Sequence, residues 1–380
     1  MILLSDCLVG HADTEIGRHG GIVPLRLPAW ADRQHGRADL RWAARNPAGV
    51  RLRMRTAART VTITLHTTVV DDGRAAVPRM VVFDGGPGRV HDIPRPSALR
   101  TRPDGAGGVQ VVGIDPGDPY DLVINRDGAE GLLEVLLPHN CQIELLDLAA
   151  DGPVAPAGPE RGPVWAHYGS SISHGSGAEQ PHQPWPVQVA RRNGWDLRNL
   201  SFSGNATLDP FAGRVAGGMP ADLVTAKVGI NVVNADCMRA PMFRTAVHGF
   251  VDSVRERLPQ TPIVLFSAVS CPMQEDTPGP VRHTGGRFVP ARRDVEGERD
   301  ALTLSMSRRI VEDVVRARQS ADPHLFHVDG RALLGPDDTG TLFDGLHPDQ
   351  TGTDLIAARF VDALPPGVRA ALQPNTSADR

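Results

Sequence analysis

The sequence lacks the features that mark membrane, metal-binding and nucleic-acid-binding proteins. No run of about 18 apolar residues occurs, so we expect no membrane-spanning helix and no membrane partner. The net charge of the 380 residues is −4, which argues against a nucleic-acid partner, because such domains are usually strongly basic. No segment has the His-Glu-x-x-His pattern, and no glycine cluster has phosphate-loop spacing. We therefore expect neither a metal nor another cofactor.

Cysteine and lysine are also scarce. The four cysteines, Cys7, Cys141, Cys237 and Cys271, are widely spaced and form no Cys-x-x-Cys pair, which indicates reduced thiols that are buried or half-buried. Lys227 is the only lysine, and the other basic residues are arginines. We interpret this bias as the codon usage of a GC-rich, actinomycete-like genome and not as a functional signature.

The N-terminal segment does not have the pattern of a secretory signal. It has no charged n-region, and Asp6 interrupts its apolar stretch early. Because the sequence starts at Met1, we expect a cytoplasmic protein. Hydrophobic residues make up 41% of the chain and charged residues 22%, which is typical of a soluble globular protein. The length favours two domains.

The first of these domains, residues 1–150, has the pattern of a β-domain. Residues 50–56 alternate apolar and basic side chains, and residues 60–70 alternate again, with β-branched residues through most of their length. Glycine- and proline-rich turns separate the apolar segments. We expect an antiparallel β-sandwich that is almost entirely β. Its further strands are predicted at 79–83, 108–114, 132–137 and 142–148.

Residues 151–163 are rich in proline and glycine. Proline forbids regular helix and favours extended chain, so this tract is the predicted linker. After it, short apolar runs alternate with helix-length periodic segments, which predicts a parallel sheet with helices on both faces over residues 164–366, followed by a tail at 367–380. The predicted strands are 164–168, 197–202, 223–228, 263–267 and 325–328, and the predicted helices are 185–193, 242–258, 298–319 and 355–364.

Two motifs that follow predicted strands supply a nucleophile and its base. Residues 167–175 read His-Tyr-Gly-Ser-Ser-Ile-Ser-His-Gly, a glycine-flanked turn that can present a serine hydroxyl. It differs from the Gly-x-Ser-x-Gly elbow of α/β-hydrolases. Residues 344–348 read Asp-Gly-Leu-His-Pro, so one short loop can aim Asp344 and His347 at a serine. Taken alone, each motif fits an ordinary turn as well.

Two further motifs can stabilise the negative charge that acyl transfer develops. Residues 200–206 carry Gly204, which can offer a backbone N–H with no side chain in the way. Residues 227–234 carry Asn231, whose amide can donate to an oxyanion. Asn205, Asn231 and Asn234 are each equally compatible with a simple turn.

In combination, the four motifs resemble the SGNH (GDSL-type) serine hydrolases, which are named for Ser, Gly, Asn and His in four blocks of this order. The resemblance covers residues 164–364 and implies a flavodoxin-like, three-layer α/β fold. It also implies a catalytic triad of Ser171 as nucleophile, His347 as general base and Asp344 as the carboxylate. The oxyanion hole that it implies consists of Ser171, Gly204 and Asn231.

The chain departs from the family pattern in two blocks. Gly-Asp-Ser reads Gly169-Ser170-Ser171, and Gly-x-Asn-Asp reads Gly-Ile-Asn-Val at 229–232. Neither missing aspartate belongs to the triad, so hydrolytic chemistry is not excluded. The serine pair leaves two candidates for the nucleophile, and we choose Ser171 because its spacing to Gly175 matches the family.

Residues 1–150 are similar to the β-sandwich, carbohydrate-binding-like domains that precede some of these catalytic domains, most visibly at 137–145. Two-domain relatives include carbohydrate esterases and acyltransferases of actinomycete natural-product pathways, such as the salicylyl acyltransferase of tetracycline biosynthesis. The resemblance implies acyl transfer through an acyl-enzyme, from a small-molecule donor to water or to a hydroxyl of a small molecule or glycan. The alternatives are a dedicated pathway acyltransferase that uses an acyl-CoA and a non-catalytic glycan-binding protein.

Residues 271–297 form a long connection with no clear periodicity. Loops of this length in a compact domain are usually functional or disordered. This one contains arginines that can meet an anionic acyl donor such as a coenzyme A thioester, although a solvated lid explains them as well. The arginines are Arg282, Arg287, Arg292 and Arg293.

Overall fold

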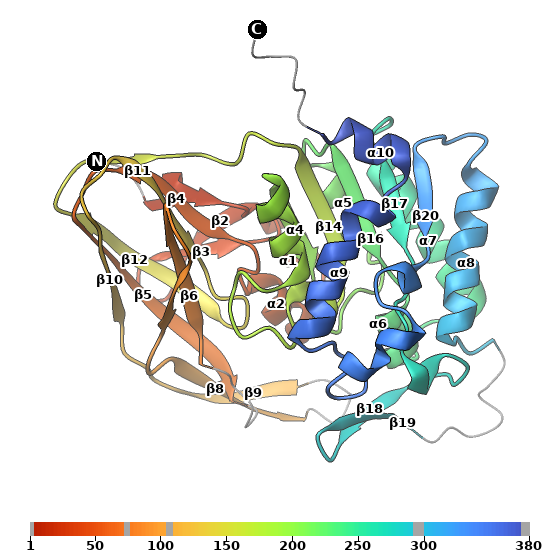
Figure 1. The fold of residues 1–380 in the computed structure, drawn as a ribbon. Coiled ribbons are helices and arrows are strands. Elements are labelled where there is room, and N and C mark those ends of the chain that lie inside the picture. Colours follow the sequence, from red (N-terminus) through yellow and green to blue (C-terminus); the bar gives the residue numbers. More distant parts are fainter. Residues whose placement is uncertain (1–3, 72–76, 104–108, 292–299, 374–380) are drawn as a thin grey trace, which may run out of the picture. The chain divides into compact units, whose positions relative to one another are not determined.

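A computed structural model of the protein describes residues 4–71, 77–103, 109–291 and 300–373 (Figure 1). The chain forms two compact units. The β unit comprises Met1–Glu160 with Glu179–Gln183, and the α/β unit comprises Arg161–Ala178 with Pro184–Arg380. In the described part of the chain, no helix is long and apolar enough to cross a membrane.

The β unit consists of two sheets. One has the strand order β1-β4-β11-β6-β7, with β13 also paired to β4, and the other has the order β2-β3-β12-β5-β8-β9, with β10 also paired to β5. Among the described strands, every pair in these sheets is antiparallel except β5 with β8. The first sheet contains β1 (Leu8–Val9), β4 (Arg51–Thr56), β11 (Gly131–Leu136), β6 (Arg79–Asp84), β7 (Arg89–Asp92) and β13 (Val154–Pro156). The second contains β2 (Asp13–Ile16), β3 (Ile22–Leu25), β12 (Gln142–Ala150), β5 (Thr60–Asp71), β8 (Ser97–Pro103), β9 (Val109–Asp115) and β10 (Tyr120–Asn125).

One apolar core joins the two sheets. Along β5, Val61, Ile63 and Leu65 are fully buried, and Leu52 and Met54 of β4 belong to the same cluster. This period of two places one face of each strand against the other sheet. Burial of each such side chain contributes roughly 1.5–3 kcal/mol. The predicted sandwich is therefore present.

The N-terminal half is not almost entirely β, as the sequence pattern led us to expect. Two short helices, α1 (Ala29–Gln34) and α2 (Ala38–Arg45), follow β3. They were missed because helices of 6 and 8 residues are too short to show a clear period. The predicted linker 151–163 contains the boundary between the two units, at Glu160 and Arg161, and its first part forms β13, which pairs antiparallel with β4. A strand at the edge of a sheet tolerates proline, because its outer N–H groups need no partner strand.

The α/β unit contains one parallel sheet of five strands in the order β15-β14-β16-β17-β20. In chain order this is 2-1-3-4-5, the flavodoxin-like arrangement, in which ligands bind at the carboxyl ends of the strands. The structure confirms the predicted parallel sheet. Its strands are β14 (Val164–Gly169), β15 (Asp196–Ser201), β16 (Leu223–Lys227), β17 (Ile263–Phe266) and β20 (Leu325–Val328).

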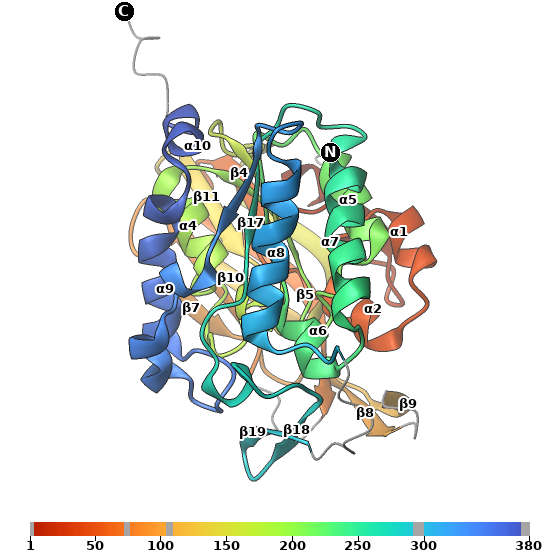
Figure 2. The ribbon, with the colours of Figure 1, turned by 90° about the vertical axis from the view of Figure 1, so that its right-hand side faces the viewer.

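Helices cover both faces of this sheet, as Figure 2 shows for α9 and α7. On β14, Trp165 contacts Trp185 and Phe360 on one face, with ring centroids 5.8 and 4.8 Å away, whereas Tyr168 contacts Phe250 on the other face at 5.2 Å. The helices that carry these rings are α4 (Trp185–Asn193), α9 (Gln350–Ala363) and α7 (Ala240–Arg255). The unit also contains α3 (Ser171–His174), α5 (Pro210–Gly217), α6 (Ile230–Ala235), α8 (Leu304–Arg318) and α10 (Pro366–Ala371).

Two predicted boundaries near the C-terminus need correction. Helix α8 begins at Leu304, where Thr303 caps it by accepting a hydrogen bond from the Met306 N–H at 3.2 Å, and not at 298, which lies outside the described residues. The segment 367–380 is not simply a tail, because α10 extends to Ala371 and buries Val368. Proline at the start of α10 concealed it in the sequence, although proline is well suited to a first helical turn.

Candidate functional site

Ser171 is the first residue of α3, two residues after the carboxyl end of β14. Gly169 ends the strand, and a Cβ at that position would lie 2.6 Å from the Ser173 Oγ and 3.0 Å from the His167 Nε2, so only glycine fits there. Gly175 ends α3 with a φ of 123°, a conformation that favours glycine. Ser171 itself is buried, with 7% of its surface exposed.

The side chains of Ser171, His347 and Asp344 form a continuous hydrogen-bonded chain. The Ser171 Oγ is 2.8 Å from the His347 Nε2, and the His347 Nδ1 is 2.7 Å from the Asp344 Oδ2. The other Asp344 oxygen accepts hydrogen bonds from the backbone N–H groups of His347 at 2.7 Å and Leu346 at 3.0 Å. These are the distances that a serine–histidine–carboxylate triad requires.

Asp344 is ionised at neutral pH. Its burial opposes the charged form, but the hydrogen bonds and the proximity of His347 outweigh that effect and leave the pKa of Asp344 below its usual value. A carboxylate here can hold the His347 Nδ1 as a donor. The Nε2 is then free to accept a proton from Ser171.

The neighbouring Ser170 occupies a different environment. It is completely buried, and within the described residues its Oγ has no hydrogen-bond partner. It precedes α3 in extended conformation, with φ −86° and ψ −166°. The structure therefore places Ser171, and not Ser170, beside His347.

Gly204 and Asn231 lie after the two strands that flank β14, namely β15 and β16. Gly204 is exposed with a φ of 71°, and no atom lies within 4 Å of where its Cβ would be, so its backbone is open to a ligand. Asn231 is buried, and its Oδ1 accepts a hydrogen bond from the Ala206 N–H at 3.0 Å. That bond fixes the amide orientation and leaves the Nδ2 as the group that can donate to a ligand.

Hydrogen bonds through Glu275 and Cys271 connect α8 to the loop of Asp344 and His347. Arg308, 5% exposed, donates to both oxygens of Glu275 at 2.6 and 2.9 Å. Burial opposes the charge of Glu275, but these hydrogen bonds prevail and lower its pKa. Glu275 also accepts from the Cys271 N–H at 2.9 Å, and the Cys271 thiol donates to the Gly345 carbonyl at 3.4 Å.

Three of the four cysteines are buried thiols. Cys7, Cys141 and Cys271 are buried as expected, whereas Cys237 is exposed, contrary to the expectation. Burial raises the pKa of Cys271 to about 12 and that of Cys7 to about 11, so both stay protonated thiols.

The connection 271–297 is more ordered than its sequence indicated. It contains the 3₁₀ helix η2 (Pro272–Gln274) and the antiparallel hairpin β18 (Val281–Thr284) and β19 (Arg287–Pro290). Arg282 and Arg287 are exposed on this hairpin, and neither forms an ion pair with a described residue. The other two arginines, at 292 and 293, lie outside the described residues.

Two phenylalanines flank His347, and neither was predicted as a site residue. The Phe288 ring meets the imidazole edge-on, at 5.4 Å and 71°, and the Phe343 ring lies nearly parallel to it, at 6.3 Å and 29°. The Phe288 N–H donates to the Asp344 carbonyl at 2.8 Å. Phe343 could have been predicted to lie near the site, because it directly precedes Asp344 in the sequence. Nothing in the sequence indicated Phe288.

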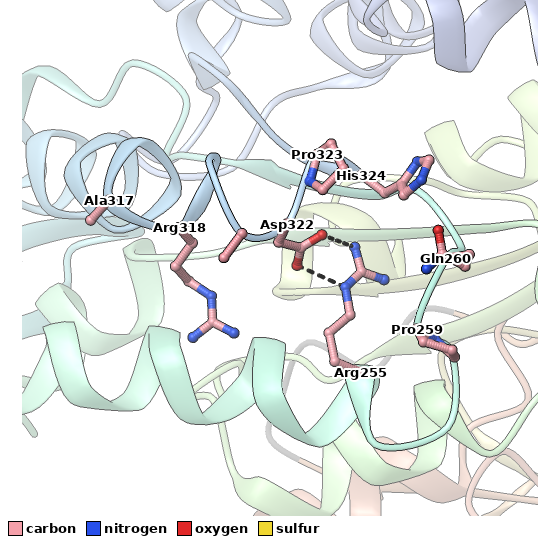
Figure 3. A pocket seen from close by; sticks show the side chains of 9 residues that line it. Arg255, Pro259, Gln260, Ala317, Arg318, Asp322, Pro323 and His324 are labelled. Atoms are coloured by element: carbon pink, nitrogen blue, oxygen red, sulfur yellow. Dashed lines mark hydrogen bonds and ion pairs between the residues drawn. The ribbon is translucent and has the colours of Figure 1, made fainter.

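A separate pocket lies at the amino ends of the strands of the same sheet, whereas the candidate site lies at their carboxyl ends (Figure 3). Its volume is about 410 Å³, and it is lined by Gln260 and His324, which precede β17 and β20 at the amino ends of these strands. Its charges are satisfied locally, since Arg255 donates to Asp322 at 2.8 and 2.9 Å. None of the predicted site residues lines this pocket.

The described residues contain no group of three or more His, Cys, Asp or Glu side chains that could hold a metal ion.

Comparisons with known proteins fit this architecture. The sequence model of the GDSL-like lipase/acylhydrolase family matches residues 167–355, which include every predicted site residue. No curated protein sequence matches the chain significantly.

Several solved structures are similar to nearly the whole chain. A salicylyl-acyltransferase, SsfX3, from a tetracycline biosynthetic pathway has 23% identity and a TM-score of 0.76, with 94% of this chain and 93% of that one covered. A putative GDSL-like lipase from Bacteroides ovatus has 18% identity and a TM-score of 0.64, covering 96% and 95%. A family two carbohydrate esterase from Cellvibrio japonicus has 11% identity and a TM-score of 0.56, covering 97% of each chain. These similarities show a shared fold for both units.

Proposed function

Since residues 167–355 belong to the GDSL-like lipase/acylhydrolase family, we propose that the protein catalyses serine-dependent acyl transfer through an acyl-enzyme. The donor is a small-molecule ester or thioester, and the acceptor is water or a hydroxyl of a small molecule or glycan. The observation that carries this proposal is the hydrogen-bonded chain from Ser171 through His347 to Asp344.

In the acylation step, the Ser171 Oγ attacks the carbonyl carbon while the His347 Nε2 takes its proton. The bond from that carbon to the leaving oxygen or sulfur then breaks, and Nε2 returns the proton to the leaving group. Asp344 keeps the imidazole in the required tautomer and stabilises its transient positive charge. The acceptor resolves the acyl-enzyme by the same steps in reverse.

The negative charge on the carbonyl oxygen needs donors that are already in place. We assign this role to the backbone N–H groups of Ser171 and Gly204 and to the Asn231 Nδ2. The hydrogen bond of the Asn231 Oδ1 with Ala206 supports this assignment, because the amide cannot turn without losing it. Donors that need no reorganisation contribute most to transition-state stabilisation.

An active-site serine probe tests the proposal against a non-catalytic glycan-binding protein. A fluorophosphonate should label the native protein once, at Ser171, and the label should be measured by intact-protein mass spectrometry. The hydrogen bonds that join Ser171, His347 and Asp344 favour an enzyme over a non-catalytic binding protein. A folded protein that stays unlabelled would favour the binding protein.

A dedicated acyltransferase with an acyl-CoA donor is the second candidate. It is supported by the exposed guanidinium groups of Arg282 and Arg287, which form no ion pair with a described residue and lie on the hairpin that contacts the Asp344 loop. Their replacement by glutamine should raise the KM for an acyl-CoA more than that for the matching acyl-pantetheine, which lacks the nucleotide phosphates. Equal effects on the two donors would count against this candidate.

Asn231→Ala is expected to lower kcat by roughly 100- to 1,000-fold, the usual effect of losing one oxyanion donor. Asn231→Asp separates the two tasks of this side chain, because aspartate can still accept from the Ala206 N–H but has no amide donor. Steady-state kinetics with an aryl ester should show a loss in Asn231→Asp at least as large as in Asn231→Ala. If Asn231→Asp keeps wild-type kcat, Asn231 only holds residue 206 in place.

A further inference from the structure

The surface beside the catalytic histidine carries an exposed aromatic side chain. Phe343 is 57% exposed, although a buried phenylalanine would be more stable by roughly 1.5–3 kcal/mol. The ring does not project freely into solvent, because one of its edges lies against Gly177 in the segment after α3. The contact is so close that a Cβ on Gly177 would lie 3.1 Å from the Phe343 Cε1. The remaining part of the ring is available to a ligand.

Phe288 contributes a second ring at the same place. Its edge-on contact with His347 and its N–H bond to the Asp344 carbonyl fix it to the catalytic loop. His283 packs against it at 5.0 Å and 75°, which further restricts the Phe288 ring. The imidazole of His347 therefore has one aromatic ring nearly parallel to it and another nearly perpendicular.

The position of these rings relative to the reaction follows from the triad. The His347 Nε2 faces the Ser171 Oγ, so the alcohol oxygen that receives the proton from Nε2 must lie next to the imidazole. Phe288 and Phe343 flank the same imidazole at 5.4 and 6.3 Å, so a carbon substituent that extends away from Ser171 over His347 would meet their rings. The acyl group is on the opposite side of the breaking bond.

We propose that Phe288 and Phe343 bind the alcohol portion of the substrate, and that this portion is a planar aromatic alcohol. The inference rests on the proposed function of the same site and specifies its substrate class. Aromatic rings gain roughly 0.5–1.5 kcal/mol from offset or edge-to-face contacts beyond their apolar burial. A phenylalanine side chain offers no hydrogen bond to the hydroxyl groups of a sugar.

The corresponding reaction with benzyl acetate balances without any co-reactant other than water. The Ser171 Oγ forms a bond to the acetyl carbon, the bond from that carbon to the benzyl oxygen breaks, and the Ser171 proton passes through Nε2 to give benzyl alcohol. Water then releases acetate from Ser171. In the reverse sense, an aromatic alcohol enters the same position as an acyl acceptor.

The test compares esters that differ only in the alcohol. Benzyl acetate and cyclohexylmethyl acetate have the same acyl group and similar size, but only the first alcohol is planar and aromatic. Methyl 6-O-acetyl-glucoside represents a sugar alcohol. The quantity measured is kcat/KM, which reports the steps up to acylation, for wild type, Phe343→Leu, Phe288→Leu and the control Met242→Ala. Met242 is 60% exposed at the start of α7, away from the catalytic residues in sequence.

Wild type should prefer benzyl acetate to both other esters. Phe343→Leu and Phe288→Leu should lower the ratio of benzyl to cyclohexylmethyl kcat/KM by roughly 3- to 10-fold, in line with the loss of one aromatic contact. Met242→Ala should leave the ratio unchanged. Leucine keeps the apolar volume at both positions, and fluorophosphonate labelling of each variant verifies that its site is intact.

The ways in which this inference and the proposed function can fail are distinguishable. Absence of Ser171 labelling in the wild type would overturn the proposed function itself. Labelling of Ser171 together with an unchanged ratio in both phenylalanine variants would overturn only the aromatic site. A wild-type preference for the sugar ester, or no turnover of benzyl acetate, would overturn it as well.

Discussion

Ser171→Ala is expected to lower kcat for an aryl ester by about a million-fold and to abolish the acyl-enzyme. The reason is that, among the described residues, Ser171 supplies the hydroxyl that is hydrogen-bonded to the base. The Ser171 Oγ is the atom 2.8 Å from the His347 Nε2, whereas the Oγ of Ser170 is buried. Residual turnover should reflect only binding and the oxyanion donors. Steady-state kinetics and intact-protein mass spectrometry measure the two effects.

Ser170→Ala is the matched control for this substitution. It removes a hydroxyl one residue away in the same turn, and the enzyme should still form the acyl-enzyme and turn over the ester. If Ser170→Ala is the inactive variant and Ser171→Ala keeps full activity, the nucleophile has been assigned to the wrong serine.

His347→Ala should be nearly as damaging as Ser171→Ala, with a loss in kcat of about a million-fold, because a serine hydroxyl without a base is a poor nucleophile at neutral pH. Residues of a triad act as one unit, so the double variant Ser171→Ala/His347→Ala should be no slower than either single variant. His324→Ala, which alters the pocket at the other edge of the sheet, serves as the histidine control and should keep wild-type kcat. Additive losses in the double variant would contradict a shared role.

Asp344→Asn tests the third member of the same chain. The asparagine Oδ1 can still accept from the N–H groups of Leu346 and His347, so the loop should keep its conformation. Its NH₂ group cannot accept the His347 Nδ1–H, which favours the wrong tautomer, and kcat should fall by about 10⁴-fold, less than for His347→Ala. Asp362→Asn, whose side chain is 83% exposed on α9, is the matched control. Equal kcat values in the two variants would exclude a role for Asp344 in catalysis.

The strands of the α/β unit were predictable because buried parallel strands are short, continuous apolar runs. Helix α4 begins and ends where its periodicity predicted, at Trp185 and Asn193. The short helices α3, α5 and α6 had no such signal, since each has at most 8 residues and lies in a glycine- or asparagine-rich segment. Their positions are set by tertiary packing, which a local pattern does not contain.

Long-range pairing was the other part that the sequence did not reveal. The parallel contact of β5 with β8 joins Thr68 to Ser97, and the hairpin of β18 and β19 has no fully buried residue in either strand. Neither leaves a local hydrophobic period. For the same reason the aromatic contact of Phe288 with His347 could not be predicted, because the two residues are distant in sequence and meet only through the fold.

The candidate triad and oxyanion residues were predicted from motif order, and the structure adds the geometry that such a motif cannot give. In particular, the spacing to Gly175 favoured Ser171 over Ser170, and the structure shows why the two serines differ: one contacts His347, and the other is completely buried. The spacing alone could not show which of the two adjacent hydroxyl groups points toward His347.

The most direct test of this account is to locate the acyl group on the protein. The wild-type enzyme should be exposed to a panel of aryl esters and acyl thioesters, quenched in acid, digested and analysed by tandem mass spectrometry. One acyl group is expected on the peptide that contains both serines, with fragment ions that place it on Ser171. An acyl group on Ser170 or on any other residue, or turnover of an ester with no acylated peptide under any quench condition, would contradict it.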